Sequence, residues 1–279
     1  MIPAEFDYVA PASLDEAIQA LSHGDADAKL LAGGHSLIPL MKLRLAAPSL
    51  LVDLRRVDGL TGVKRNGGLS VGAMTTHAEV AGSGLGLLSD AAGTIADPQV
   101  RHRGTIGGSL AHGDPASDLP AVALVTEATL VTRGPNGERE IAASDFFRDY
   151  LETALEHDEV ITEIRFAEGL DGWGHGYEKF NRRREDWAMV AVCALARVQD
   201  GTFTDVRVGL TNMGSTPLRA RAVEEALRGQ SVSAESIARA AEQAAEGTSP
   251  PADLNASADY KRHLARVLCR RALERAAGV

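Results

Sequence analysis

The sequence predicts an α+β protein of two domains, and three observations carry this prediction. The chain has 279 residues, 44% of them apolar, so it exceeds one typical domain and can bury a sizeable core. Short apolar runs with the character of strands alternate with stretches of helical spacing. Four glycines fall between Glu168 and Gly176, including Gly169 and Gly174, and this density indicates a flexible join between domains.

The part before the join has the pattern of short strands and helices, and capping signals mark two helix starts. Ser13-Leu14-Asp15-Glu16 and Thr76-His77-Ala78-Glu79 both have the capping-box spacing. The turn Gly134-Pro135-Asn136-Gly137 predicts a β-hairpin of residues 129–133 and 138–141. Other strands are expected at residues 29–32, 50–53, 69–72 and 159–166, and further helices at residues 85–96 and 116–125.

The part after the join is predicted to be a smaller α+β domain. Its apolar runs and helical spacings predict a sheet with helices against it. The expected strands are residues 177–180, 188–198 and 203–210, and the expected helices are residues 219–227, 234–245 and 259–277. We therefore expect one domain of residues 1–168 and a second of residues 176–279.

Charge and cysteine content exclude several partners and locations. A formal charge of −9 and a pI near 5.4 argue against nucleic acid or an acidic membrane surface as a partner. Cys193 and Cys269 lie far apart in apolar surroundings, which suits reduced core thiols, and two thiols cannot hold an iron–sulfur cluster alone. Neither a signal peptide nor a membrane span is recognisable, so we expect a cytoplasmic protein; peripheral association with the inner face of the membrane stays open.

Two glycine-rich segments are candidates for holding a phosphate. The first, Leu31-Ala32-Gly33-Gly34-His35-Ser36-Leu37, runs from a strand into paired glycines, which let backbone N–H groups point into one concavity. Taken alone, such a pair is more often a tight turn. The second, Thr105-Ile106-Gly107-Gly108-Ser109, adds two hydroxyl groups, and Asp118 follows near a helix start, where it could also be a simple cap.

These segments exclude two common nucleotide sites. Neither has the G-x-G-x-x-G arrangement of nicotinamide-binding folds or the Gly-Lys-Ser/Thr ending of a P-loop. His35 and His102 are not spaced with other ligands as in a metal site, so no metal site is expected. No nucleophile, base and orienting group occur together, so no catalytic residue for hydrolysis is expected.

In this order and context the two segments strongly resemble the FAD-binding subunits of the molybdenum hydroxylases, in particular the branch of aerobic carbon monoxide dehydrogenase. The resemblance covers essentially the whole chain. It implies a vanillyl-alcohol-oxidase (PCMH)-type FAD-binding domain of two lobes, about residues 1–55 and 56–168, followed by the C-terminal α+β domain.

The resemblance also implies a set of FAD-binding residues. The two glycine segments would cradle the pyrophosphate and ribityl chain, and Asp118 would accept hydrogen bonds from hydroxyl groups. Ile161 would pack on a flavin ring or adenine, with a plain core role as its alternative, and Lys179 would lie beside the cofactor unless it is a solvated strand residue. Trp187 would stack on the isoalloxazine unless it merely packs in the core. The implied residues are Leu31, Ala32, Gly33, Gly34, His35, Ser36, Leu37, Thr105, Gly107, Gly108, Ser109, Asp118, Ile161, Lys179 and Trp187.

The resemblance implies an oxidoreductase in which the chemistry of substrate oxidation lies on other chains. The expected partners are a small subunit with 2Fe-2S clusters and a large molybdopterin subunit, arranged as a dimer of heterotrimers (a heterohexamer). FAD is expected to be non-covalent, because no histidine or cysteine stands at a convincing attachment position. Electrons would leave the FAD for a quinone or another acceptor.

Several alternatives stay open at this point. The substrate of the complex could be carbon monoxide, an N-heterocycle, an aldehyde or xanthine, because the substrate site would lie on another chain. A flavin-free scaffold is a second alternative, against which the intact glycine pairs argue. A free-standing flavin oxidase would need its own base, for which we find no constellation. The branch that reduces aromatic thioesters carries extra cysteines that this chain lacks.

Overall fold

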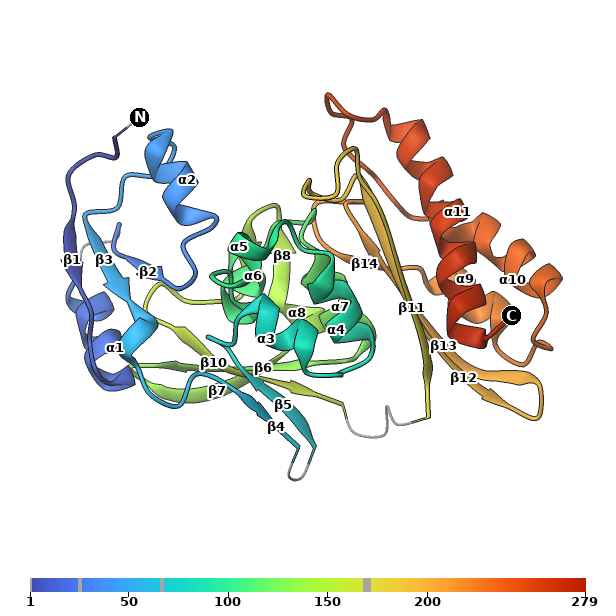
Figure 1. Ribbon diagram of the computed structural model, residues 1–279, viewed down its shortest axis with the longest axis horizontal. Coiled ribbons are helices and arrows are strands. Elements are labelled where there is room, and N and C mark those ends of the chain that lie inside the picture. Colours follow the sequence, from blue (N-terminus) through green and yellow to red (C-terminus); the bar gives the residue numbers. More distant parts are fainter. Residues whose placement is uncertain (1, 25–26, 66–67, 168–171) are drawn as a thin grey trace.

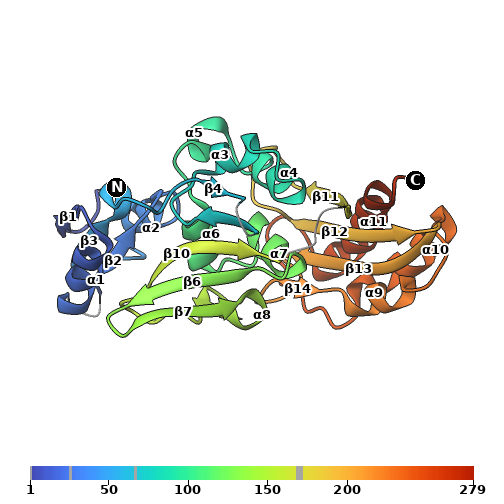
Figure 2. The same cartoon turned by 90° about the horizontal axis from the view of Figure 1, so that it is seen from below.

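The computed structural model describes residues 2–24, 27–65, 68–167 and 172–279. Three larger sheets follow one another along the molecule, each with its own helices (Figures 1 and 2). The predicted mixture of strands and helices is confirmed. Gly169 of the predicted join lies outside the described residues.

The N-terminal lobe is a parallel three-stranded sheet in the order β1-β3-β2. Its helix α1 turns Ala17, Ile18 and Leu21 toward the sheet, and these side chains are buried. Their spacing matches one face of a helix, so the apolar pattern explains this layer. The elements are β1 (Asp7–Val9), α1 (Leu14–His23), β2 (Lys29–Leu31), α2 (Leu37–Lys42), β3 (Leu50–Asp53) and the 3₁₀ helix η1 (Leu54–Arg56).

The two capping signals have different outcomes. At α1 the Ser13 hydroxyl accepts a hydrogen bond from the Glu16 N–H, but the Glu16 carboxylate accepts from Ala12 N–H instead of completing the box. At α3 the box is complete between Thr76 and Glu79. Both helix starts are thus placed as predicted, and one of the two boxes is only half formed.

The second lobe is an antiparallel sheet in the order β4-β5-β10-β6-β7, covered by helices α3 to α7 (Figure 1). The predicted hairpin forms between β6 and β7, with Gly137 at φ +108°. A short hairpin of β8 and β9 was not predicted. The elements are β4 (Val63–Lys64), β5 (Leu69–Gly72), α3 (His77–Gly82), α4 (Leu87–Gly93), α5 (Pro98–Arg101), α6 (Ile106–His112), α7 (Asp118–Val125), β6 (Thr129–Gly134), β7 (Gly137–Ala142), α8 (Ala143–Phe146), β8 (Phe147–Asp149), β9 (Glu152–Thr153) and β10 (Val160–Phe166).

The C-terminal part is an antiparallel sheet in the order β11-β12-β13-β14, with the long helix α11 packed against β11 and β12. Its three predicted strands and three predicted helices all form, and a 3₁₀ turn ends the second helix. The elements are β11 (Gly174–Phe180), β12 (Val190–Gln199), β13 (Thr202–Thr211), β14 (Leu218–Arg219), α9 (Arg221–Leu227), α10 (Ala234–Ala241), η2 (Glu242–Ala245) and α11 (Ala258–Ala277).

Two glycines assigned to the flexible join belong to strand β11 instead. β11 begins at Gly174, before the predicted start of the second domain at residue 176. A Cβ on Gly174 would lie 1.8 Å from the Ala276 carbonyl oxygen, and one on Gly176 would lie 2.1 Å from that of Ala272. These glycines therefore allow α11 to pack directly on the strand backbone, a requirement that local sequence does not reveal.

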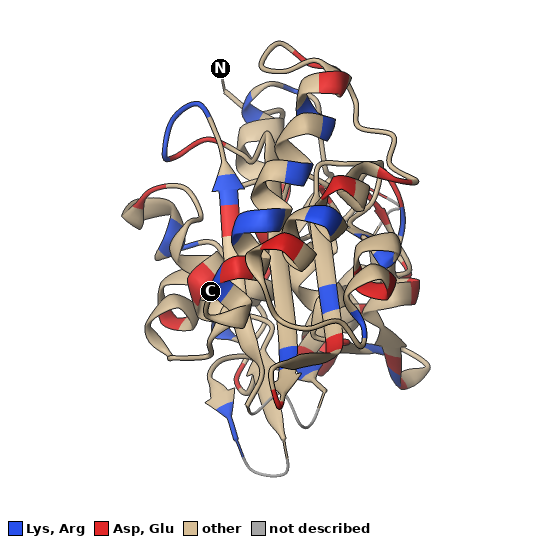
Figure 3. Cartoon of the chain, turned by 90° about the vertical axis from the view of Figure 1, so that its right-hand side faces the viewer, with Lys and Arg blue, Asp and Glu red and all other residues tan. Residues whose placement is uncertain are grey.

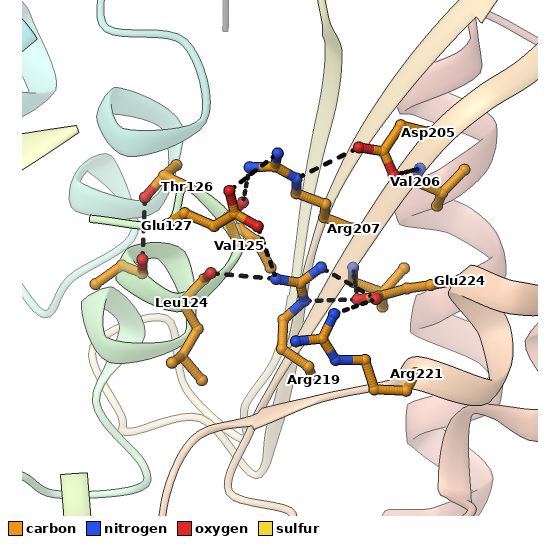
Figure 4. Close-up of polar contacts among 12 residues, drawn as sticks. Leu124, Val125, Thr126, Glu127, Asp205, Val206, Arg207, Arg219, Arg221 and Glu224 are labelled. Carbon is orange, nitrogen blue, oxygen red and sulfur yellow. Dashed lines mark hydrogen bonds and ion pairs between the residues drawn. The ribbon is translucent and has the colours of Figure 1, made fainter. Parts of the chain in front are cut away.

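Two arginines of the C-terminal sheet cap the end of helix α7 (Figure 4). Arg207 donates to the Val125 carbonyl at 3.2 Å, and Arg219 donates to the Leu124 carbonyl at 3.4 Å. Carbonyl groups in the last turn of a helix lack intrahelical donors and attract cations. This contact holds α7, whose first residue is Asp118, against the C-terminal domain.

The loop before α11 depends on one carboxylate. Asp253 accepts hydrogen bonds from Asn255 N–H, Ala256 N–H and the fully buried Lys261 ammonium, at 2.7 Å. Burial alone would raise the pKa of Asp253, but these bonds outweigh it and lower that pKa. A lowered carboxyl pKa stabilises the fold above the ordinary value of about 3.9, and this contribution is lost as pH falls through the folded-state pKa.

We therefore expect Asp253→Asn to lower the melting temperature near neutral pH, with a smaller difference from wild type in acid. Thermal unfolding followed by circular dichroism at both pH values measures this. Asp259→Asn is the matched control, because the Asp259 side chain is 94% exposed and its pair with Arg262 is a surface one. An Asp253→Asn effect that did not shrink in acid would contradict the role of the charge.

The face formed by the C-terminal helices carries basic and acidic residues intermixed (Figure 3). Such a face lacks the continuous positive field that nucleic acid requires. No helix among the described residues combines the length and apolarity needed to cross a membrane.

Candidate functional site

All of the predicted site residues line one cavity of about 570 Å³. Each part of the fold contributes to it: the loop from β2 into α2, helix α6 with the start of β10, and strand β11 with the loop that follows it. Residues from positions 31 to 187 are thus brought together around one space.

The first glycine segment presents unpaired backbone donors. Gly34 has φ +77°, a left-handed conformation that glycine adopts without strain, and Ser36 is right-handed. Within the described part of the chain, the N–H groups of Gly34, His35 and Ser36 donate to no acceptor. Successive N–H groups in such a turn form a concavity that binds anions. The segment is therefore suited to a phosphate.

The first glycine segment touches the backbone of Arg103 and Gly104, directly before the second segment. A Cβ on Gly33 would lie 2.3 Å from the Arg103 carbonyl oxygen and 2.7 Å from the Gly104 Cα. Gly33 is therefore required for contact between the segments and not for a turn. This contact sets the distance between the two walls of the cavity.

The second glycine segment differs from the first. It forms the start of α6, with Thr105 as the N-cap whose hydroxyl accepts from Gly108 N–H at 3.2 Å. Gly107 N–H donates to the Ala73 carbonyl at 2.8 Å, and a Cβ on Gly107 would lie 2.6 Å from the Ala73 Cβ. Neither glycine of this pair has a positive φ. Gly107 therefore serves close packing, and both glycines line the cavity together with Ser109, whose hydroxyl has no partner among the described residues.

A buried ion pair joins the second lobe to the C-terminal domain in the cavity wall. The Lys179 ammonium lies 2.9 Å from Asp118, and the side chains are 5% and 6% exposed. The Tyr177 hydroxyl also donates to Asp118, and burial, followed by the Asp118 charge, raises the Tyr177 pKa well above its usual value. The alternative of a solvated Lys179 is therefore wrong. Any hydroxyl bound by Asp118 must share the carboxylate with these two donors.

Ile161 and Trp187 occupy contrasting positions. Ile161 on β10 is 5% exposed and belongs to the core cluster as well as to the cavity wall, so its core role is observed and its packing on a cofactor ring stays a prediction. Trp187 lies in the loop after β11 and is 55% exposed, so it does not merely pack in the core. An exposed indole at the edge of a cavity is free to stack on a planar ligand.

Sequence reasoning missed several residues at the cavity, among them Tyr177, which bonds Asp118, and His77. Tyr177 lies two positions before Lys179 on the same strand, so the period-2 rule places both on one face and could have found it. His77 lines the cavity as the first residue of α3, just after the cap Thr76, and no sequence signal marked it. No three His, Cys, Asp or Glu side chains in the described ranges gather in a way that could hold a metal ion.

Comparison with known proteins places this geometry in a family. Residues 4–167 match the model of the FAD binding domain in molybdopterin dehydrogenase, and residues 175–276 match the CO dehydrogenase flavoprotein C-terminal domain. The chain belongs to the FAD-binding subunits of the molybdenum hydroxylases. The carbon monoxide dehydrogenase medium chain of Hydrogenophaga pseudoflava is 43% identical over 99% of this chain and 98% of that one.

Relatives of this flavin subunit include proteins named for other substrates. The 6-hydroxypseudooxynicotine dehydrogenase complex subunit alpha of Paenarthrobacter nicotinovorans is 36% identical over 99% of this chain and 96% of that one. The solved carbon monoxide dehydrogenase of Hydrogenophaga pseudoflava superposes with a TM-score of 0.96 at 44% identity, covering 100% of this chain and 99% of that one. The predicted family and fold are thereby confirmed.

Three observations indicate that the cavity residues of this flavin subunit suit FAD. The unpaired N–H groups of Gly34, His35 and Ser36 suit its pyrophosphate, and the hydroxyl of Ser109 has no protein partner among the described residues. The exposed ring of Trp187 suits a planar group. Phosphate, hydroxyl and ring contacts are what a flavin dinucleotide needs, and the cavity offers all three.

Proposed function

We propose that this chain holds one FAD without a covalent link and passes electrons within a complex of the molybdenum hydroxylase family. The first glycine segment is the observation that carries this proposal, because it lines the cavity and three of its N–H groups have no acceptor among the described residues. When bound, FAD supplies the ability to take up electrons singly and to release them as a pair. The chain itself supplies position and electrostatics.

The proposed roles of the residues follow from their contacts. Residues 31–37 and 105–109 hold the pyrophosphate and ribityl chain, with Asp118 bonding hydroxyl groups from its place between Lys179 and Tyr177. Ile161 packs on a ring of the cofactor, and Trp187 stacks on the isoalloxazine. The cofactor thereby bridges a FAD-binding domain of residues 1–168 and a C-terminal domain of residues 176–279.

The proposed partners are a small subunit with 2Fe-2S clusters, which delivers electrons, and a large molybdopterin subunit, which oxidises the substrate. A dimer of these heterotrimers in the cytoplasm, with a quinone or another electron acceptor, completes the proposal. Carbon monoxide is the proposed substrate, supported by 43% identity to a carbon monoxide dehydrogenase medium chain. An N-heterocyclic substrate is the second candidate, supported by the 36% identity to the nicotine-related relative.

The state of the two cysteines supports a non-covalent link to FAD. Cys193 and Cys269 are both buried outside the cavity lining, and burial raises the pKa of each thiol to about 12. A protonated, enclosed thiol cannot attack a flavin. Histidines do line the cavity, among them His35 and His112, so chemistry at a histidine must be tested directly.

We expect acid denaturation of the complex, purified through this chain, to release one FAD per copy into the supernatant. Flavin fluorescence and protein assay give the ratio. Flavin that stays with the precipitated polypeptide would contradict the non-covalent link, and a complex without flavin would support a scaffold instead. Addition of carbon monoxide or of an N-heterocycle to the intact complex, followed by flavin absorbance, distinguishes the two substrates.

A further inference from the structure

His77 is held in the cavity wall by contacts that fix its ring. Its backbone N–H donates to the Gly104 carbonyl at 2.9 Å, and the residue is 5% exposed. A Cβ on Gly104 would lie 2.7 Å from the His77 Cδ2 and 3.0 Å from its Nε2, so the ring packs closely on the glycine backbone. Gly104 in turn touches Gly33 of the first glycine segment. The imidazole therefore lies beside the segment that carries the unpaired N–H groups.

The ring has no hydrogen-bond partner within the described part of the chain. Nδ1 is enclosed and unpartnered, whereas Nε2 is not enclosed in this way, and His77 is one of the residues that line the cavity. Burial, followed by the electrostatic influence of His35 and Arg101, lowers the His77 pKa to about 4, so the imidazole is neutral at neutral pH. A neutral imidazole carries one proton, on one nitrogen.

That proton belongs on Nε2. A buried N–H without an acceptor is the rarer kind of orphaned group in proteins, while an unpaired acceptor is tolerated somewhat more often. The tautomer with the proton on Nε2 leaves only a lone pair enclosed at Nδ1 and presents an N–H to the cavity. His77 thus offers the cavity a fixed, neutral donor.

We propose that His77 is a further FAD-binding residue whose Nε2–H donates a hydrogen bond to a phosphate oxygen of FAD. This inference rests on the proposed function and extends it by one residue. The phosphates are the anionic groups of FAD, and Arg101, whose charge acts on His77, is positive. The neighbouring unpaired N–H groups of the first segment favour the same end of the cofactor.

The stability of the flavin-free chain distinguishes this binding role from a structural one, because Nδ1 is enclosed without a partner among the described residues. An unpartnered buried nitrogen costs stability, so a residue of similar size without it should leave the flavin-free fold as stable or make it more stable. We expect His77→Leu to weaken FAD binding by about 10- to 100-fold, the value of one hydrogen bond to a charged group. The melting temperature of the flavin-free chain should stay the same or rise.

The experiment measures FAD dissociation constants and flavin-free melting temperatures for the full chain and three variants. His77→Gln keeps an amide donor and should recover part of the affinity lost in His77→Leu. His102→Gln, at an exposed histidine outside the cavity lining, should match wild type. ADP, which carries two phosphates without the flavin, should lose affinity for His77→Leu in parallel with FAD.

Each outcome bears on one claim. A wild-type chain that binds no FAD overturns the proposed function itself. Wild-type binding with an unchanged constant for His77→Leu overturns only the role of His77. A lowered melting temperature in both His77 variants assigns the residue to the fold instead, and loss of FAD but not ADP affinity contradicts the phosphate contact.

Discussion

Lys179→Met is expected to lower the free energy of unfolding by about 3–5 kcal/mol, because it leaves a buried carboxylate without its ionic partner. Asp118 is 6% exposed and lies 2.9 Å from the Lys179 ammonium. Methionine fills a similar volume but brings no charge, so among the described residues the carboxylate keeps only the hydrogen bond from Tyr177. Urea denaturation of the flavin-free chain, followed by circular dichroism, measures the change.

Two further variants separate the lost pair from a general effect of the substitution. Arg270→Met removes one member of a surface pair, whose arginine is 54% exposed, and should cost about 0–1 kcal/mol. The double variant Asp118→Leu with Lys179→Met removes both charges and should recover most of the loss, since apolar replacements of a buried pair are often neutral. A single Lys179→Met variant no less stable than Arg270→Met would contradict a buried charged pair.

The elements that local sequence could predict are those whose signals lie within one turn or one strand. The caps at Ser13 and Thr76 and the turn ending at Gly137 each depend on residues a few positions apart, and each forms where expected. Local sequence could not predict the role of Gly174 and Gly176. Glycine is needed at both positions because helix α11, about a hundred residues later, packs on their backbone. Glycine density has two causes, and only the tertiary structure distinguishes them.

In the candidate site, too, local sequence predicts some features, and others depend on tertiary contacts. The segments around Gly34 and Ser109 could be found as sequence strings, and the family resemblance supplied Asp118 and Lys179. That Asp118 and Lys179 pair with each other could not be read from the chain, because 61 positions separate them. The contribution of His77 depends on the enclosure of one ring nitrogen, which is a property of packing alone.

Gly33→Val is expected to weaken FAD binding by at least about 100-fold. The Cβ of the new valine would lie 2.3 Å from the Arg103 carbonyl oxygen. The backbone of the first glycine segment must therefore move away from the backbone that leads into the second. This movement displaces the unpaired N–H groups of Gly34 and Ser36 from the rest of the cavity wall. Loss of two hydrogen bonds to charged phosphate oxygens, at about 1.5–3 kcal/mol each, gives an effect of this size.

Gly82→Val is the matched control, because it adds the same side chain where an added Cβ meets nothing within 4 Å and where φ is not positive. It should bind FAD like wild type. Ser109→Ala, which removes one hydroxyl from the other wall, should cost about tenfold. Flavin content and circular dichroism are measured for all three. A folded Gly33→Val chain with wild-type affinity would mean that the two glycine segments can separate without moving the donors, and the proposed pyrophosphate site would then be wrong.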